Sequence, residues 1–158
     1  MSKVTFVLNG QAVESSENPT KRLLDILRED HGLVGAKEGC GEGECGGCAV
    51  LLDYKIVNSC LTPLGSVQDK QVITIEGLSL STEGQTIKKA FEDYGSVQCG
   101  ICTPGMMIAT ASLLHHNQKP TEAEIREGLS GNLCRCTGYN MIVKAIQYLA
   151  DEKGELWC

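Results

Sequence analysis

The sequence is poor in aromatic residues and in positive charge. Phe, Trp and Tyr together make up 4% of its 158 residues, so it has few rings on which nucleic-acid bases could stack. The formal net charge is −6, and an acidic protein repels the phosphate backbone of nucleic acids. We therefore expect no nucleic-acid partner, and this sign of charge suits docking to other proteins.

Long apolar runs are also absent from the sequence. Residues 1–10 contain no apolar core of the roughly 7–15 residues that a secretory signal needs. No stretch of the chain approaches the roughly 18 apolar residues that span a bilayer. We expect a cytoplasmic protein with no membrane contact. In that reducing compartment, a chain with nine cysteines is predicted to use them mainly as metal ligands rather than as disulfide partners.

The first half of the chain is predicted to consist mainly of strands. Asn9-Gly10 separates two short runs of alternating apolar residues, which predicts a β-hairpin. A helix is predicted from Asn18-Pro19 to Asp30, since leucines recur there at helical spacing and Gly32 follows. The predicted strands are residues 3–8, 11–14, 49–53, 56–60 and 72–76, with a turn at Tyr54-Lys55.

The second half is predicted to be helical. Thr103 and Pro104 suit the N-cap and the first turn of a helix, and Thr121 to Glu124 has the pattern of a capping box. Four short helices predict a small bundle. The predicted helices are residues 86–94, 103–116, 122–130 and 140–150.

The change from strands to helices predicts an α+β fold with two domains. Gly, Ser and Thr cluster between Gly77 and Gly84, as they do in segments that connect structured modules. The predicted domains are residues 1–77 and 84–158. Each contains one group of four cysteines.

The first group of four cysteines matches the plant-type pattern for a [2Fe–2S] cluster. Its spacing is C-x4-C-x2-C, followed by eleven residues and a fourth cysteine, and in such sites four thiolates hold two irons. The group consists of Cys40, Cys45, Cys48 and Cys60. Nearby glycines let the backbone fold tightly and turn its amides toward the cluster sulfurs. They are Gly39, Gly41, Gly43, Gly46 and Gly47.

The same loop also matches a phosphate-binding motif. Residues 41–46 fit G-x-G-x-x-G, but that motif should follow a strand and open a helix. No strand is predicted directly before it, and Glu42 and Glu44 would repel a pyrophosphate. We therefore prefer the iron–sulfur interpretation.

The second group of four cysteines has a different spacing. It consists of Cys99, Cys102, Cys134 and Cys136. On a helix the two cysteines of C-x-C would lie about 200° apart, so they share one centre only if residues 134–136 form a loop, which Gly131 and Gly138 permit. Cys102 and the C-x-C loop each precede a predicted helix, whose positive end would stabilise an anionic cluster. Arg135 either adds to that field or is a solvated loop charge.

Structural zinc is the alternative for both groups. Zinc sites usually pair two C-x2-C units about 12–20 residues apart, whereas 50 residues separate Cys48 from Cys99 here. The ninth cysteine, Cys158, is predicted to be a free terminal thiol. No Ser/His/Asp triad, carboxylate pair or nucleophilic cysteine is evident, so no catalytic residue is assigned.

Three segments together resemble one known family. They are GCGEGECGGC at residues 39–48, QCGICTPG at 98–105 and GNLCRCTGY at 131–139. In this order they look like the iron–sulfur subunit of the molybdenum hydroxylases, the group of xanthine dehydrogenase, aldehyde oxidoreductase, nicotinate dehydrogenase and carbon monoxide dehydrogenase. The resemblance implies an N-terminal plant-ferredoxin-like β-grasp and a C-terminal four-helix bundle, each with one [2Fe–2S] cluster.

The resemblance also implies partners and an electron path. A separate large subunit with molybdopterin would hydroxylate the substrate, an FAD subunit would often be present, and the holoenzyme could dimerise. Electrons would pass from molybdenum to the cluster of the helical domain, then to the ferredoxin-like cluster and FAD. By the same resemblance, Gln98 and Cys136 would face the partner's pterin, Gln98 through its amide. An ordinary loop glutamine is the alternative for Gln98.

The substrate would be chosen by the large subunit. Residues 130–146 look most like the small subunits of xanthine dehydrogenases, so a purine is the leading hypothesis, and nicotinate, aldehyde or carbon monoxide are the alternatives. Two other functions stay open: a free-standing two-cluster ferredoxin and a structural module held by zinc. Simple ferredoxins lack a helical second half, which favours the subunit hypothesis.

Overall fold

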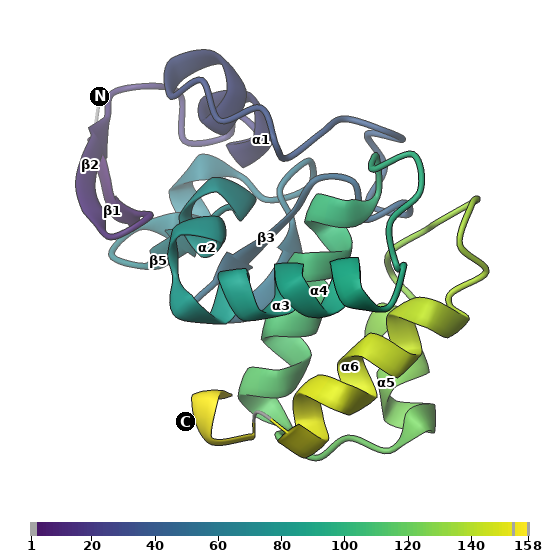
Figure 1. Cartoon of the computed structure of the whole chain (residues 1–158). Coiled ribbons are helices and arrows are strands. Elements are labelled where there is room, and N and C mark those ends of the chain that lie inside the picture. Colours follow the sequence, from purple (N-terminus) through teal and green to yellow (C-terminus); the bar gives the residue numbers. More distant parts are fainter. Residues whose placement is uncertain (1–2, 153, 158) are drawn as a thin grey trace.

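A mixed five-stranded sheet followed by helices makes up the computed structural model, which describes residues 3–152 and 154–157 (Figure 1). The strands are β1 Val4–Leu8, β2 Gln11–Ser15, β3 Ala49–Leu52, β4 Lys55–Asn58 and β5 Gln71–Ile73. Their order in the sheet is β2-β1-β5-β3-β4, with β1 parallel to β5 and the other pairs antiparallel. The predicted α+β fold class is confirmed.

The first hairpin forms as predicted. Val4, Phe6 and Leu8 of β1 are buried, and the residues between them are exposed. Asn9 and Gly10 both have positive φ angles, 50° and 82°, as the favoured two-residue hairpin turn requires. The turn therefore sets the register in which β1 pairs with β2.

The turn between β3 and β4 lies one residue earlier than predicted. It is formed by Asp53 and Tyr54, whose φ angles are 49° and 61°, rather than by Tyr54 and Lys55. Strand β4 therefore starts at Lys55 and ends at Asn58, and the chain turns again around Cys60. This second turn brings Cys60 next to Cys48, which directly precedes β3.

The last strand is shorter than predicted. Strand β5 ends at Ile73, and a helix, α2 Ile75–Leu80, occupies the rest of the predicted strand. The Thr74 amide donates to the side chain of Asn9 instead of to a neighbouring strand, which ends the ladder. Leu78 of α2 then packs into a core formed mainly by helices.

The helix of the first half is also shorter than predicted. Asn18 is not its N-cap, because the Asn18 side chain accepts a hydrogen bond from the Thr20 amide in a local turn. The helix starts with α1, Leu23–Asp25, and continues as the π-helical segment η1, Ile26–Asp30. The first two amides of α1 donate to carbonyls on either side of Cys60, so the helix lies against the segment that carries this cysteine.

The helices of the second half agree with the prediction to within two residues at each end, except that the first of them starts four residues earlier. They are α3 Thr82–Asp93, α4 Thr103–His116, α5 Glu122–Leu129 and α6 Asn140–Glu152, and the short 3₁₀ segments are η2 Leu64–Val67 and η3 Gly154–Trp157. Helix α3 begins earlier than predicted because the Ser81 hydroxyl caps it. The N-cap of α4 is Cys102 rather than Thr103. Thr121 and Glu124 form the predicted capping box.

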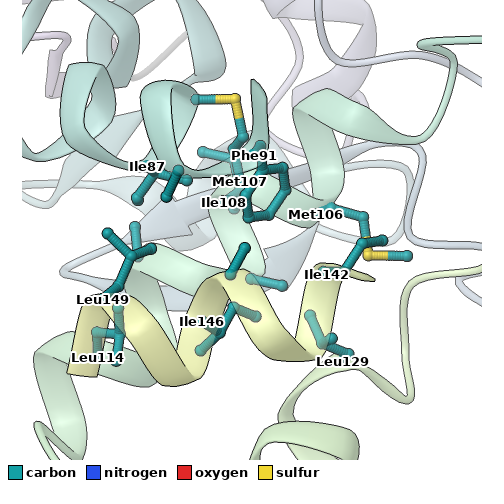
Figure 2. Packing of buried hydrophobic residues seen from close by; sticks show 14 of the residues in the cluster. Ile87, Phe91, Met106, Met107, Ile108, Leu114, Leu129, Ile142, Ile146 and Leu149 are labelled. Carbon is teal, nitrogen blue, oxygen red and sulfur yellow. The ribbon is translucent and has the colours of Figure 1, made fainter. Parts of the chain in front are cut away.

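One helix joins the two halves of the molecule. Most of α4 is buried, and its side chains share a hydrophobic cluster with α3, α6 and strand β3. Figure 2 shows Met106 and Ile108 of α4 in this cluster with Phe91 of α3 and with Ile142 and Ile146 of α6. A second cluster lies between the sheet and α1. Because β3 contributes to the first cluster, the sheet and the helices are packed against each other.

Two further predictions concern the chain as a whole, and a third concerns Cys158. No helix among residues 3–152 and 154–157 combines the length and the apolar composition of a membrane span. The predicted domains, 1–77 and 84–158, stay a prediction, since α2 crosses the proposed boundary and contacts both α3 and β5. Cys158 lies outside the described residues, so its predicted role stays a prediction as well.

Candidate metal centres

The first cysteine loop, residues 39–48, depends on its glycines. A Cβ atom on Gly39 would lie 2.8 Å from Cys45 Sγ, which is too close for two atoms that are not bonded. Gly43 has a φ angle of 79°, a conformation that residues with a side chain rarely adopt. The loop therefore closes round its cysteines only with these small residues, as the sequence indicated.

The four cysteines of the first group lie in two pairs. Cys40 and Cys45 contact each other in the loop, where Cys40 is exposed. Cys48 and Cys60 contact each other in the interior, at 2% and 3% exposure, and burial raises the pKa of Cys60 to about 11. Each iron of a two-iron cluster needs two thiolates close together. The β3–β4 hairpin supplies the second pair by bringing Cys60 back to the loop.

Backbone amides point at the sulfurs of the outer pair. The amides of Glu42 and Glu44 each donate to Cys40 Sγ at 3.3 Å, and the Gly47 amide donates to Cys45 Sγ at 3.4 Å. The bonds from Glu42 and Glu44 lower the pKa of Cys40 to about 7. Such hydrogen bonds stabilise thiolate ligands and tune the reduction potential of a cluster.

The loop does not have the surroundings of a phosphate site. It precedes strand β3, whereas a dinucleotide-binding loop follows a strand and opens a helix. The amides of Glu42 and Glu44, which would have to face a phosphate, are directed to a cysteine sulfur. The iron–sulfur interpretation of residues 41–46 is therefore favoured.

Charged and polar side chains hold the loop from two sides. Arg22 bonds to Asp25 at 2.7 Å and to Glu38 at 2.9 Å. These bonds raise the pKa of the guanidinium further above its ordinary value, and the bond to Arg22 lowers the pKa of the Glu38 carboxyl. From β4, the Asn58 side chain donates to the Gly43 carbonyl at 2.7 Å. The residue before the loop and the middle of the loop are thus tied to separate parts of the N-terminal half.

Glu76 holds the segment that leads into this loop. Its carboxylate accepts hydrogen bonds from the Gly35 amide at 2.8 Å and from the Thr74 hydroxyl at 2.6 Å. Burial raises the pKa of Glu76, but the hydrogen bonds outweigh burial, so the pKa lies below the ordinary 4.5. A carboxyl with a lowered pKa stabilises the fold above its ordinary pKa. That contribution is lost as the pH falls from 4.5 through the lowered value.

Glu76→Gln removes the titrating carboxyl. We therefore expect the free energy of unfolding of this variant to fall less than that of the unmodified chain as the pH drops through this acid range. At pH 7 the same change should lower the free energy of unfolding by about 1 kcal/mol, the net worth of such partly screened hydrogen bonds. Urea unfolding at pH 7 and at steps below pH 4.5 measures both effects. Glu127→Gln, which changes an exposed carboxyl of α5, is the control. An unaltered acid response in Glu76→Gln would contradict this role.

The second group of cysteines is assembled by two loops that end where helices begin (Figure 1). Cys99 and Cys102 lie between α3 and α4, and Cys134 and Cys136 lie between α5 and α6. The Sγ atoms of Cys99 and Cys136 are 3.6 Å apart, and Cys102 contacts Cys134. The C-x-C segment is a loop, as predicted. The N-terminal ends of α4 and α6 follow these cysteines closely in the sequence. The positive end of each helix dipole is therefore near thiolate ligands, which it would stabilise.

Two hydroxyl groups support the inner pair of the second group. Burial raises the pKa of Cys102 to about 12. Burial acts in the same direction on Cys134, but the Thr137 hydroxyl donates to its Sγ at 3.0 Å, and the pKa falls to about 7. The Cys134 amide donates to the Tyr139 hydroxyl at 2.8 Å. No role was predicted for Thr137 or Tyr139, although their place beside the C-x-C pair could have indicated one.

Neither group is arranged around a single ion. Within the part of the chain that the structure describes, no three His, Cys, Asp or Glu side chains are placed to hold one metal ion. The cysteines lie instead in contacting pairs. This suits four ligands divided between two irons better than four ligands round one zinc, so the zinc interpretation is disfavoured.

One edge of the second group lies at the surface. Gln98, Cys99 and Cys136 are all exposed. The exposed apolar residues near them in sequence are Val97, Ile101 and Leu133. An apolar margin around a cofactor site suits docking to another protein.

Comparisons with known proteins agree with this geometry. Residues 6–81 match the family model of the 2Fe-2S iron-sulfur cluster binding domain, and residues 74–147 match that of the [2Fe-2S] binding domain. The nicotinate dehydrogenase small FeS subunit of Eubacterium barkeri is 44% identical over 153 residues, which cover 96% of this chain and 98% of that protein. The xanthine dehydrogenase iron-sulfur-binding subunit of Escherichia coli O157:H7 is 43% identical, over 90% of this chain and 91% of that one.

A solved structure is similar over nearly the same length. It is quinoline 2-oxidoreductase from Pseudomonas putida 86, with a TM-score of 0.86 and 39% identity over 94% of this chain and 92% of that chain. The fold and the two matched models define an electron-transfer protein with two [2Fe–2S]-binding domains. The chain belongs to the family of small iron–sulfur subunits of the molybdenum hydroxylases. The predicted family, the ferredoxin-like N-terminal domain and the helical C-terminal region are confirmed.

Proposed function

We propose that eight cysteines of this chain hold its two [2Fe–2S] clusters, one pair of cysteines to each iron. The proposed pairs are Cys40 with Cys45, Cys48 with Cys60, Cys99 with Cys136 and Cys102 with Cys134. Each cluster, when bound, accepts and releases a single electron. The observation that carries the assignment is that the eight cysteines lie in four contacting pairs, and that three of these pairs join separate segments of the chain.

In the holoenzyme, this chain relays electrons from a molybdopterin centre to FAD or another acceptor. Relatives named as subunits of nicotinate and xanthine dehydrogenases support separate subunits as partners, which we propose to be a molybdopterin-binding large subunit and an FAD-binding subunit. The holoenzyme could also dimerise. The exposure of Gln98 and Cys136 supports their placement against the partner's pterin, where the Gln98 amide suits the ring edge. Cysteines that serve as metal ligands rather than as disulfide partners suit the reducing cytoplasm, where we place the protein.

The substrate that we propose for the holoenzyme is a purine such as xanthine. The resemblance of residues 130–146 to the small subunits of xanthine dehydrogenases supports it, and nicotinate is the nearest alternative, ahead of aldehydes and carbon monoxide. Relatives named for nicotinate, xanthine and quinoline are 44%, 43% and 39% identical, so identity does not separate them. Assays of the holoenzyme with xanthine and with nicotinate decide the question.

Analysis of iron, acid-labile sulfide and zinc per chain, on anaerobically purified protein, tests the cluster assignment. We expect about four irons and four sulfides, with two distinct rhombic EPR signals after reduction by dithionite. Zinc without sulfide or an EPR signal would make the chain a structural module and end the electron-transfer proposal.

Purification from the native source tests the partners. We expect the chain to co-purify with larger subunits and with molybdenum. A monomeric chain with both clusters and no molybdenum would identify a free-standing ferredoxin instead.

A further inference from the structure

Three segments that carry or border the cysteines meet at one buried side chain, that of Asn132. It lies two residues before Cys134 and is 4% exposed. Its neighbours are Gly46, in the first cysteine loop, and Gly105, in the first turn of α4. The contact therefore joins the first cysteine group to both segments of the second.

Hydrogen bonds attach Asn132 to the first cysteine loop and to its own loop. Its side-chain amide donates to the Gly46 carbonyl at 3.1 Å, and the amide of the next residue, Leu133, donates to the Cys45 carbonyl at 3.0 Å. Behind it, the Tyr139 hydroxyl donates to the Asn132 carbonyl at 3.3 Å. Two successive carbonyls of the first loop are thus bound by two successive residues of the second.

The two glycines leave room for this contact and for nothing larger. A Cβ atom on Gly46 would lie 2.5 Å from both the Asn132 amide nitrogen and the Gly131 carbonyl oxygen. A Cβ atom on Gly105 would lie 2.5 Å from the Gly46 carbonyl oxygen and 2.9 Å from the Asn132 amide nitrogen. Groups packed so closely hold one another at fixed distances.

The surrounding packing makes this contact a local one. Strand β3 and helix α4 share the larger hydrophobic cluster, so the sheet and the helices stay joined without Asn132. A cavity of about 230 Å³ lies beside the contact and is lined by Cys45 and Leu133, among others. If Asn132 were shortened, the two loops would have space to shift relative to each other.

We propose that Asn132 is a positioning residue that fixes the separation and the relative orientation of the two clusters. The inference rests on the proposed function, since it requires both clusters. Asn132 acts through the carbonyls of the first loop rather than as a ligand. Electron transfer between two centres slows steeply as they move apart, so precise support by neighbouring residues decides its rate.

The test compares Asn132→Ala with Asn140→Ala in the full chain loaded with iron and sulfide. Asn140 is exposed at the start of α6 and bonds to Arg126, so the control removes the same atoms away from the contact. Three quantities are measured: iron per chain, the EPR splitting caused by spin–spin interaction between the two reduced clusters, and the rate at which an electron redistributes between them after pulsed reduction.

We expect Asn132→Ala to keep both clusters, to change the splitting and to slow redistribution severalfold, while Asn140→Ala behaves as the unmodified chain. Unaltered splitting and rate in an iron-replete Asn132→Ala chain would overturn the proposal. A purely structural role would lower the unfolding midpoint and leave these two quantities as they are. An unmodified chain that binds no iron would instead refute the proposed function.

A second variant covers the case in which Asn132→Ala fails to fold. Gly105→Ala adds a methyl group that pushes on the same contact, and we expect the same changes in splitting and rate. Gly128→Ala is its control, because a Cβ atom there meets only the flexible side chain of Leu113, at 3.2 Å. Loss of the clusters in both Asn132→Ala and Gly105→Ala would assign a structural role to the contact and overturn the proposal.

Discussion

Replacing Cys60 with Ser should remove one of the two EPR signals of the reduced chain and lower its iron from about four to about two per chain. Cys60 is 3% exposed and contacts Cys48, so its thiolate is the inner partner in the proposed first cluster. A serine hydroxyl stays protonated at neutral pH and does not supply the thiolate that iron requires. Iron analysis and EPR after dithionite reduction measure the change.

The control for Cys60→Ser is Cys158→Ser, which changes the ninth cysteine and should leave about four irons per chain. Retention of both signals in Cys60→Ser would remove this residue from the ligand set. Loss of a cluster can also unfold its module, because ligand binding and folding are coupled in small metal domains. Circular dichroism therefore accompanies the metal analysis. If both signals disappeared while the helical signal persisted, the two centres would not be independent.

Replacing Cys134 with Ser should have the complementary effect: the other EPR signal disappears and about two irons remain. Cys134 contacts Cys102, and its sulfur accepts a hydrogen bond from the Thr137 hydroxyl. The serine oxygen cannot take over this role in the second cluster. The signal of the first cluster, whose cysteines lie before β3 and after β4, should keep its shape.

Comparing the EPR signals of Cys60→Ser and Cys134→Ser tests most directly whether the eight cysteines form two groups. The signal lost in Cys134→Ser should be the one retained in Cys60→Ser. If the same signal vanished in both, the two cysteines would serve one cluster, and the division into two groups would be wrong. Thr137→Val, which leaves all cysteines in place, should keep about four irons and serves as the matched control in the second loop.

Most local features of the fold could be predicted from the sequence. Asn9-Gly10 predicted the first hairpin, and Thr121 with Glu124 predicted the capping box of α5. These features depend on φ angles and on hydrogen bonds within a few residues, so a short stretch of sequence is enough. The same holds for the glycine-rich loop around the first three cysteines.

The errors lie where distant contacts outweigh local preference. Asn18-Pro19 has the residues of a helix start, yet α1 begins at Leu23, because its first amides bond to the chain on either side of Cys60. Residues 74–76 resemble a strand, yet α2 forms there, because Leu78 packs into the helical core. A local pattern contains no information on such partners.

Cysteine spacing and glycine-rich loops are local properties, so the family, the two [2Fe–2S]-binding domains and the eight candidate ligands could be predicted from the sequence. Which cysteines are neighbours, and which residues support them, depends on contacts between distant parts of the chain. Cys99 is close to Cys102 in sequence, yet its sulfur lies 3.6 Å from that of Cys136. Asn132 reaches Gly46, 86 residues away. These contacts exist because β3 and α4 pack against each other and bring the cysteine loops together.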